Sequence, residues 1–292
     1  MKVSYKSITF TLSFFICLIT FSYSQIPAIE VKVSGKGKPV LFIPHIGCPG
    51  EMWQYVANEL GKTYQCHIIS LAGFAGQTPL DSNYTQQYLT QIRNYIKTKK
   101  LKEITLLGMN YGGFLALQLH NQPAVSKLIV IDTYPFLAQI LNPAATATDA
   151  TTYASQAKSG YLAASATDFA QMMYQTGKGM ITHDTVKARQ YAHWLTQSDR
   201  KTIASVLADQ LQTDLRAQLP SIKIPVLTIG TWYFGKNLKK MPLEEGYKMH
   251  ENFFSSLPNH KTVLTETGKD FMHWDEPAWF VKEVITFINK PL

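Results

Sequence analysis

A sharp turn that exposes one side chain for chemistry is predicted at residues 108–113, which read Gly-Met-Asn-Tyr-Gly-Gly. An apolar run at residues 104–107 precedes this turn, and a helix-like apolar run at residues 114–119 follows it. A strand, a Gly-x-Ser-x-Gly turn and a helix in this order expose a nucleophilic serine, and the glycines let the turn form without clashes. Here the exposed position holds Asn110, whose neutral amide is a poor nucleophile. The motif therefore predicts the turn and leaves its chemistry open.

Short apolar runs typical of strands alternate with segments of helical periodicity along most of the chain. Such alternation indicates βαβ units, and continuous apolar strands are typical of a parallel sheet covered on both faces. The predicted strands lie at residues 29–34, 40–44, 66–71, 104–107, 127–131, 224–230 and 261–265. The predicted helices between them lie at residues 51–60, 85–99, 114–119, 242–256 and 277–289. The sequence therefore predicts an α/β fold with the turn at the carboxyl end of one strand.

Residues 137–219 interrupt this alternation. No strand-like run occurs there, and the composition shifts to Ala, Thr, Gln and Ser. Four helix-compatible segments are predicted, at residues 148–165, 168–176, 185–197 and 202–217. Because strand character then resumes, the simplest arrangement is a helical cap inserted between two strands of one sheet. We therefore expect a core of residues 25–136 and 220–292, and an all-helical cap of residues 137–219.

Residues 1–24 have the features of a secretory signal peptide. Lys2 and Lys6 supply a positive start, residues 8–20 are almost uniformly apolar, and residues 22–24 (Ser-Tyr-Ser) suit a cleavage site. A membrane-spanning helix needs about 20 apolar residues, so this run is short for a stable membrane anchor. We therefore expect an exported protein, periplasmic or secreted after cleavage.

The charge distribution does not indicate a nucleic-acid partner. The chain carries a net charge of +8, and removing the two lysines of residues 1–24, which include no acid, leaves +6. The lysines near residues 97–102 and 236–240 are typical of a solvated helix end and a solvated loop. Nucleic-acid binding needs a basic face on a recognisable module, and none is evident. The histidines and cysteines also lack the spacing of a zinc site, so neither a metal nor another cofactor is predicted.

Two cysteines, Cys48 and Cys66, would remain after cleavage of the signal peptide. Export would permit a disulfide between them. However, Cys66 lies near the start of one predicted strand, and Cys48 lies past the end of its expected neighbour. Because a disulfide needs Cα atoms within about 7 Å, both thiols are expected to be free.

Five motifs occur in order along the chain, at residues 42–48, 71–77, 108–113, 131–136 and 271–280. On these motifs the chain resembles the α/β-hydrolase superfamily, and more narrowly secreted or periplasmic bacterial α/β hydrolases with a four-helix cap. The resemblance implies an α/β-hydrolase fold: a mostly parallel, eight-strand-like sheet with helices on both faces and an inserted all-helical cap. It also implies ester or related acyl hydrolysis by a serine, a histidine and an acid.

Two of the three catalytic positions implied by this resemblance carry a different side chain. Asn110 occupies the position of the nucleophile. The family histidine lies seven residues before a proline that corresponds to Pro277, and this position holds Asp270. His273 lies three residues later, but aligning it instead would break the matches at Phe271 and Pro277. We therefore expect His273 to pack behind the site.

The remaining catalytic positions are filled by one acid and by main-chain amides. No acid directly follows the predicted strand at 224–230, which leaves Asp132 as the acid in a family-like position. An aspartate that bonds to backbone amides at the start of a loop is an equally good interpretation of Asp132. By resemblance, the oxyanion hole would use the amides of Tyr111 and of Ile46 or Gly47.

Loss of the serine or the histidine of a catalytic triad costs about 10⁶ in turnover. We therefore expect a protein that lacks ordinary ester hydrolysis and binds a small apolar or ester-like ligand between core and cap. The candidate pocket residues are His45, Tyr134, Phe136 and Trp232.

Two other hypotheses remain open. An active hydrolase could use another nucleophile, either Cys48 paired with His45 or an aspartate formed by deamidation of Asn110. Alternatively, a scaffold protein could bind a partner through the surface of the cap at residues 137–219. The sequence does not identify such a protein partner.

Overall fold

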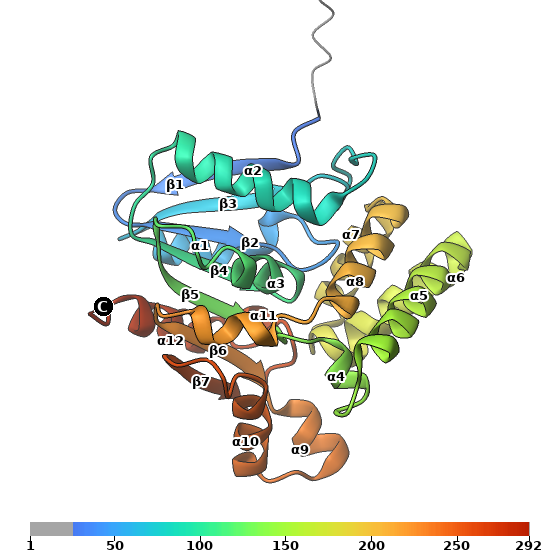
Figure 1. Ribbon diagram of the computed structural model, residues 1–292. Coiled ribbons are helices and arrows are strands. Elements are labelled where there is room, and N and C mark those ends of the chain that lie inside the picture. The colour runs from blue at the N-terminus through green and yellow to red at the C-terminus, as the bar shows by residue number, and fades with distance from the viewer. Residues whose placement is uncertain (1–25, 292) are drawn as a thin grey trace, which may run out of the picture.

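Residues 26–291, described by a computed structural model, form one seven-stranded sheet surrounded by helices (Figure 1). The strands are β1 (Ile29–Gly35), β2 (Pro39–Ile43), β3 (Gln65–Leu71), β4 (Ile104–Met109), β5 (Val125–Ile131), β6 (Val226–Thr231) and β7 (His260–Thr265). Their order is β1-β3-β2-β4-β5-β6-β7, and only β1 runs antiparallel to its neighbour. The predicted signal peptide at residues 1–24 lies outside the described residues. Within residues 26–291, no helix is both long and apolar enough to cross a membrane.

The prediction of a mostly parallel sheet is confirmed, but the strand number differs from the expected eight. Across residues 26–291 the sheet has seven strands, and β1 forms one of its edges. Only three described residues precede β1, whereas a strand usually has five or six residues. The structure therefore has no further strand beside β1 within the described part of the chain.

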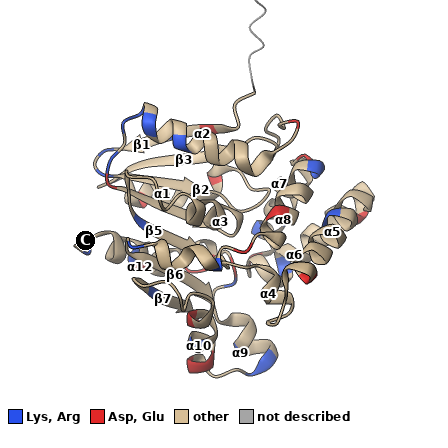
Figure 2. Ribbon diagram, viewed as in Figure 1, with Lys and Arg blue, Asp and Glu red and all other residues tan. Residues whose placement is uncertain are grey.

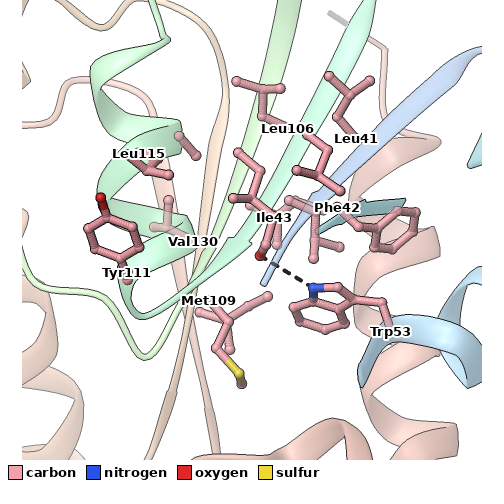
Figure 3. Packing of buried hydrophobic residues seen from close by; sticks show 14 of the residues in the cluster. Leu41, Phe42, Ile43, Trp53, Leu106, Met109, Tyr111, Leu115 and Val130 are labelled. Atoms are coloured by element: carbon pink, nitrogen blue, oxygen red, sulfur yellow. Dashed lines mark hydrogen bonds between the residues drawn. The ribbon is translucent and has the colours of Figure 1, made fainter. Parts of the chain in front are cut away.

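The central strands are buried along their whole length because helices cover both faces of the sheet. Leu41 of β2 pairs with Leu106 of β4, and every residue of both strands is buried. Two helices cover one face, α2 (Tyr84–Thr98) and α3 (Tyr111–Gln118), and two cover the other, α1 (Gln54–Leu60) and α12 (Pro277–Ile288). Figure 3 shows Tyr111 and Leu115 of α3 on one side of the strands and Trp53, in the turn before α1, on the other. This two-sided burial explains the continuous apolar runs in the sequence.

A helical cap follows β5 and ends before β6, and in Figure 1 it stands beside the sheet. Its α-helices are α4 (Ala138–Leu141), α5 (Ala147–Ala163), α6 (Ala166–Thr176), α7 (Thr185–Gln197) and α8 (Arg200–Gln212). The side chains of Thr146, Ser165, Asp184 and Asp199 accept backbone N–H bonds at the first turns of α5 to α8. Polar N-caps of this kind fix where helices begin. The presence of a cap is therefore confirmed, while the predicted domain limits remain predictions.

One cap helix ends earlier than predicted. A single helix was expected at residues 202–217, but α8 ends at Gln212 and a 3₁₀ helix begins at Arg216. Between them, the Thr213 hydroxyl donates to the Asp209 carbonyl, and the Asp214 carboxylate accepts from the Arg216 amide. Side-chain bonds to the local backbone compete with helix continuation, which explains the break.

Three further helices lie in the region after β6. They are α9 (Tyr233–Lys239), α10 (Leu243–Phe253) and α11 (Met272–Asp275). Of these, only α10 was predicted from the sequence. In Figure 2 the basic residues are spread over several outer elements, including α2 and α9, and do not gather on one side in that view.

Close backbone packing at the turn between β4 and α3 predicts the effect of adding a methyl group there. A Cβ on Gly108 would lie 2.6 Å from the backbone nitrogen of Gly113. We therefore expect Gly108→Ala to lower the free energy of unfolding by about 3 kcal/mol, as overpacking of a closed core does. Urea unfolding measures this change.

Gly160 in α5 provides the matched control, because a Cβ there has no neighbour within 4 Å. Gly160→Ala should raise the free energy of unfolding by about 0.5–1 kcal/mol through helix propensity alone. Equal effects of the two substitutions would show that the turn is not closely packed.

Candidate active site

Asn110 lies at the apex of the turn between β4 and α3, the feature that we call the elbow (residues 108–113). Its backbone has φ 51° and ψ −111°, a conformation that non-glycine residues rarely adopt. The backbone N–H of Asn110 donates to the Ile131 carbonyl at 2.8 Å, and the backbone carbonyl of Asn110 accepts from the Phe114 N–H at 3.0 Å. The elbow therefore holds residue 110 in a fixed, strained position beside the end of β5.

The side chain of Asn110 bonds to the amide that the resemblance assigns to the oxyanion hole. Its carboxamide oxygen accepts a hydrogen bond from the Tyr111 N–H at 2.8 Å. The first amides of a helix have no partner within the helix, so an adjacent polar side chain readily satisfies them. Asn110 thus fills the place that a developing oxyanion would need at Tyr111.

The loop after β2 carries the second pair of candidate oxyanion donors. Gly47 has φ 69°, and its carbonyl accepts a hydrogen bond from the Ser198 hydroxyl of the cap at 3.0 Å. The Ile46 and Gly47 amides donate to no other described residue. A hydrogen bond of 2.9 Å joins His45 Nδ1 to the Ile46 carbonyl, and burial lowers the pKa of His45 to about 4. His45 is therefore a neutral ring that shapes the loop.

Cys48 lies in the same loop but is a poor nucleophile. Its thiol is fully buried, and burial raises its pKa well above the ordinary value. The sulfur lies 3.9 Å from Nδ1 of His45, which is directed at a carbonyl. A thiolate is the reactive form of cysteine, so this environment keeps Cys48 unreactive. Cys48 and Cys66 are both free thiols, in agreement with the prediction.

Asp132 and Asp270, which we call the acid pair, both lie beyond the carboxyl ends of strands, Asp132 after β5 and Asp270 after β7. Asp132 directly follows β5, and its amide donates to the Ile229 carbonyl of β6. Asp270 lies in the loop after β7, is only 7% exposed, and donates its amide to the Met180 carbonyl of the cap. Burial raises the pKa of Asp132 to about 6. Burial, and then the charge of Asp132, raise the pKa of Asp270 well above its ordinary value.

His273 packs in an aromatic cluster. Its ring centroid lies 4.7 Å from that of Trp53, 5.0 Å from that of Phe271 and 5.9 Å from that of Phe280. The side chain is 1% exposed, and neither ring nitrogen has a hydrogen-bond partner among the described residues. Burial lowers the pKa of His273 to about 3. The ring therefore has no hydrogen bond to Asn110 or to the acid pair.

The four candidate pocket residues do not gather in one place. His45 lies in the loop after β2, and Tyr134 lies two residues after Asp132, with its ring edge-on to that of Phe253 of α10 at 5.0 Å. Phe136 instead packs in a separate cluster, with the Arg216 guanidinium 4.7 Å above its ring. Trp232 packs against the backbones of α9 and α10. Only His45 and Tyr134 thus lie near the other candidate site residues.

Tyr191 of α7 is a site residue that sequence reasoning missed. Its ring meets those of His45 and Phe271 edge-on, at 5.9 Å and 5.8 Å. Burial raises its pKa well above the ordinary value, and the carboxylates of the acid pair also contribute. A periodic stripe in the sequence could have identified this inward face, because Ala188, Tyr191, Ala192 and Leu195 are the buried residues of α7.

The arrangement fits a family that can be recognised over most of the chain. Residues 38–277 match the family described as alpha/beta hydrolase fold. The chain therefore belongs to the α/β-hydrolase family. Within residues 26–291, no three His, Cys, Asp or Glu side chains gather as a metal site would require.

Among curated proteins, the chain is distantly related to pimeloyl-[acyl-carrier protein] methyl ester esterases. The protein of Aeromonas salmonicida is 26% identical over 276 residues, which cover 90% of this chain and all of the relative. That of Vibrio atlanticus is 22% identical, with 88% of this chain and 97% of the relative covered. The relatives are thus similar along nearly their whole length.

Solved structures show the same fold. An esterase from Exiguobacterium antarcticum superposes with a TM-score of 0.71 at 23% identity, covering 90% of this chain and 96% of that one. A hydrolase from Pseudomonas aeruginosa superposes with a TM-score of 0.73 at 16% identity, covering 90% and 94%. At these identities the likeness concerns the fold alone.

The raised pKa of Asp132 predicts a pH-dependent stability change on its removal. The Asp132 carboxyl has a pKa of 3.8 in the unfolded chain and about 6 in the folded protein. It therefore stays protonated up to a higher pH when the protein is folded. The free-energy cost of ionising Asp132 in the folded protein therefore grows as the pH rises from 3.8 to 6, and it is fully present above pH 6. We expect Asp132→Asn to raise the free energy of unfolding by about 2 kcal/mol at pH 7.5 and by little at pH 4.

Urea unfolding at the two pH values checks this expectation. Glu251→Gln on the exposed side of α10 is the control and should change stability little at either pH. An equal increase in the free energy of unfolding at both pH values would contradict a pKa of Asp132 that is raised by burial.

Proposed function

We propose that this chain binds a small ester-like or apolar molecule at the elbow end of the sheet, beneath the cap, and lacks serine-type ester hydrolysis. The observation that carries the proposal is the hydrogen bond from the Tyr111 N–H to the Asn110 carboxamide at the apex of the elbow. In ordinary members a serine at this apex attacks a carbonyl, and this amide receives the resulting negative charge. Asn110 removes the nucleophile and also occupies the amide.

The histidine position supports the same conclusion. A triad histidine takes the proton of the serine and hands it to the leaving group. Asp270 stands there with a pKa raised well above its ordinary value by burial and by Asp132. No imidazole connects this carboxyl to Asn110. With both relay groups changed, only about 10³ of the rate enhancement over water would be expected to remain.

Ester hydrolysis without a covalent serine is the second candidate function. Membership of a hydrolase family, and full-length relatives that are named esterases, favour it over simple binding. Burial of Cys48 argues against a thiolate nucleophile. Asp132, whose pKa is about 6, is better suited to take a proton from an attacking water near neutral pH. Deamidation of Asn110 to aspartate is a further route to a nucleophile.

Back-substitution at the two changed positions tests the first proposal. We expect the native protein to hydrolyse short-chain nitrophenyl esters no faster than Asn110→Ala, because both lack a nucleophile. The double variant Asn110→Ser with Asp270→His should raise the rate at least 100-fold by restoring hydroxyl and imidazole. Asn110→Ser alone, which retains His273, is the matched control and should gain little.

The hydrolysis rate and the mass of the native protein distinguish the two candidate functions. A native rate that falls at least tenfold on Asp132→Asn would overturn the binding proposal and support water activation by Asp132. A mass increase of about 1 Da at residue 110, together with loss of activity in Asn110→Ala, would instead support a nucleophile formed by deamidation.

Export is a further part of the proposal and rests on residues 1–24 alone. Their basic start, apolar run and small residues are typical of a cleaved signal peptide. Terminal sequencing of the chain after expression in a bacterial host should then find a start near Gln25. An uncleaved Met1 terminus would contradict export by this route.

A further inference from the structure

Helix α9 leaves a leucine and several lysines exposed at an outer edge of the molecule (Figure 1). None of its residues is buried, and Leu238 is 77% exposed, the largest fraction among the exposed large apolar side chains of residues 26–291. Lys236 and Lys239 lie on either side of Leu238 along the helix, and Lys240 ends it. A single exposed leucine is common on protein surfaces, so its surroundings decide whether it has a role.

The three lysines of this segment carry positive charge that no acid of the described chain neutralises. None of them forms an ion pair with a carboxylate within residues 26–291. The first acids after them are Glu244 and Glu245 of α10, and Glu244 already pairs with Lys248 at 2.7 Å. Lys240 Nζ instead donates to the carbonyl of Asn237 at 3.2 Å. The charge is therefore available to an anionic partner.

The cap continues this exposed surface beside the start of α9. The ring centre of Tyr233, the first residue of α9, lies 5.4 Å from the Lys269 ammonium, which donates to the Lys178 carbonyl at 2.6 Å. Lys178 and Met180 belong to a short π-helix of the cap, Gly177–Ile181. Both are exposed, and Met180 is 51% exposed. A second apolar side chain therefore lies in water beside a lysine, on a segment adjacent to α9.

We propose that this surface binds reversibly to an anionic phospholipid bilayer. We call it the basic–apolar surface, and it consists of Lys178, Met180, Lys236, Leu238, Lys239 and Lys240. Anionic headgroups attract lysines, and the acyl boundary beneath them accepts apolar side chains that project from the same surface. This inference concerns a surface outside the elbow and does not depend on the proposed ligand-binding function.

The combination of charge and apolar area favours a bilayer over a nucleic acid. The phosphates of a nucleic acid would attract the same lysines but would leave Leu238 and Met180 in water. A lysine near an anionic bilayer strengthens binding about fivefold, so four lysines together contribute several hundredfold. Two apolar side chains alone are too few for stable attachment. Binding should therefore require both kinds of side chain and weaken in high salt, which screens the charge.

Co-sedimentation with vesicles tests the contribution of charge. The full chain should bind vesicles of phosphatidylcholine and phosphatidylglycerol in equal amounts at least tenfold more tightly than vesicles of phosphatidylcholine alone. Lys236→Glu combined with Lys239→Glu should weaken this binding at least tenfold, because two attractive charges become repulsive. Lys97→Glu combined with Lys99→Glu is the matched control. It changes the net charge equally at the exposed end of α2, away from α9 (Figure 2), and should weaken binding less than threefold.

The contribution of the apolar side chains is measured separately. Leu238→Ser should weaken binding to the anionic vesicles at least threefold, whereas Leu162→Ser, at an exposed leucine of α5, should leave it unchanged. In Leu238→Trp the added indole should shift its emission to shorter wavelength and be quenched by lipids brominated in their acyl chains. Tyr55→Trp on α1, where the native side chain is 49% exposed, is the control and should show no added quenching. All variants share residues 1–24, so these differences report on the basic–apolar surface.

Four results would overturn the proposal. They are no binding to the anionic vesicles, equal binding to both kinds of vesicle, equal weakening by the two pairs of charge reversals, and no quenching of the indole added at position 238. Binding of a single-stranded oligonucleotide by the native chain, unaffected by Leu238→Ser and without any binding to vesicles, would also overturn it and would indicate a nucleic-acid surface instead.

Discussion

The close approach of β4 and α3 at the elbow is the constraint on which the rest of the site depends. Gly108 and Gly112 allow backbone to meet backbone, so residue 110 must adopt a positive φ and point away from the strand. This geometry costs free energy in any protein and persists because the core around it determines it. The elbow therefore forms although residue 110 carries an amide side chain. The Asn110 side chain caps α3 by accepting a hydrogen bond from the Tyr111 N–H.

Electrostatics distinguish this site from an ordinary triad. A triad alternates a carboxylate with an imidazole, so that charge is neutralised when a proton moves. In the proposed site a carboxyl would stand in each place, and burial raises the pKa of both Asp132 and Asp270. Retention of a proton or activation of a water would each relieve this charge. The second candidate function follows from the same imbalance.

Periodicity predicted most of the fold, because buried strands and amphipathic helices leave strong apolar patterns. The helix at 185–197 has the predicted bounds, and the strand at 66–71 differs by one residue. Prediction failed where local polar bonds override periodicity, as at Thr213, where α8 stops. It also missed α9, which buries none of its residues and so has no apolar stripe to detect.

By itself the sequence determined which side chains stand at the elbow and after each strand, because motif spacing is a property of the chain. It therefore identified Asn110, Asp132 and Asp270 as candidates. Only the tertiary structure decided which of them meet. Folding places Asp132 and Asp270, 138 positions apart, at the same edge of the sheet and packs Tyr191 of the cap against His45 and Phe271. It places Phe136 in a separate cluster. Burial, which sets their pKa values, arises from packing across the whole fold and leaves no mark in local sequence.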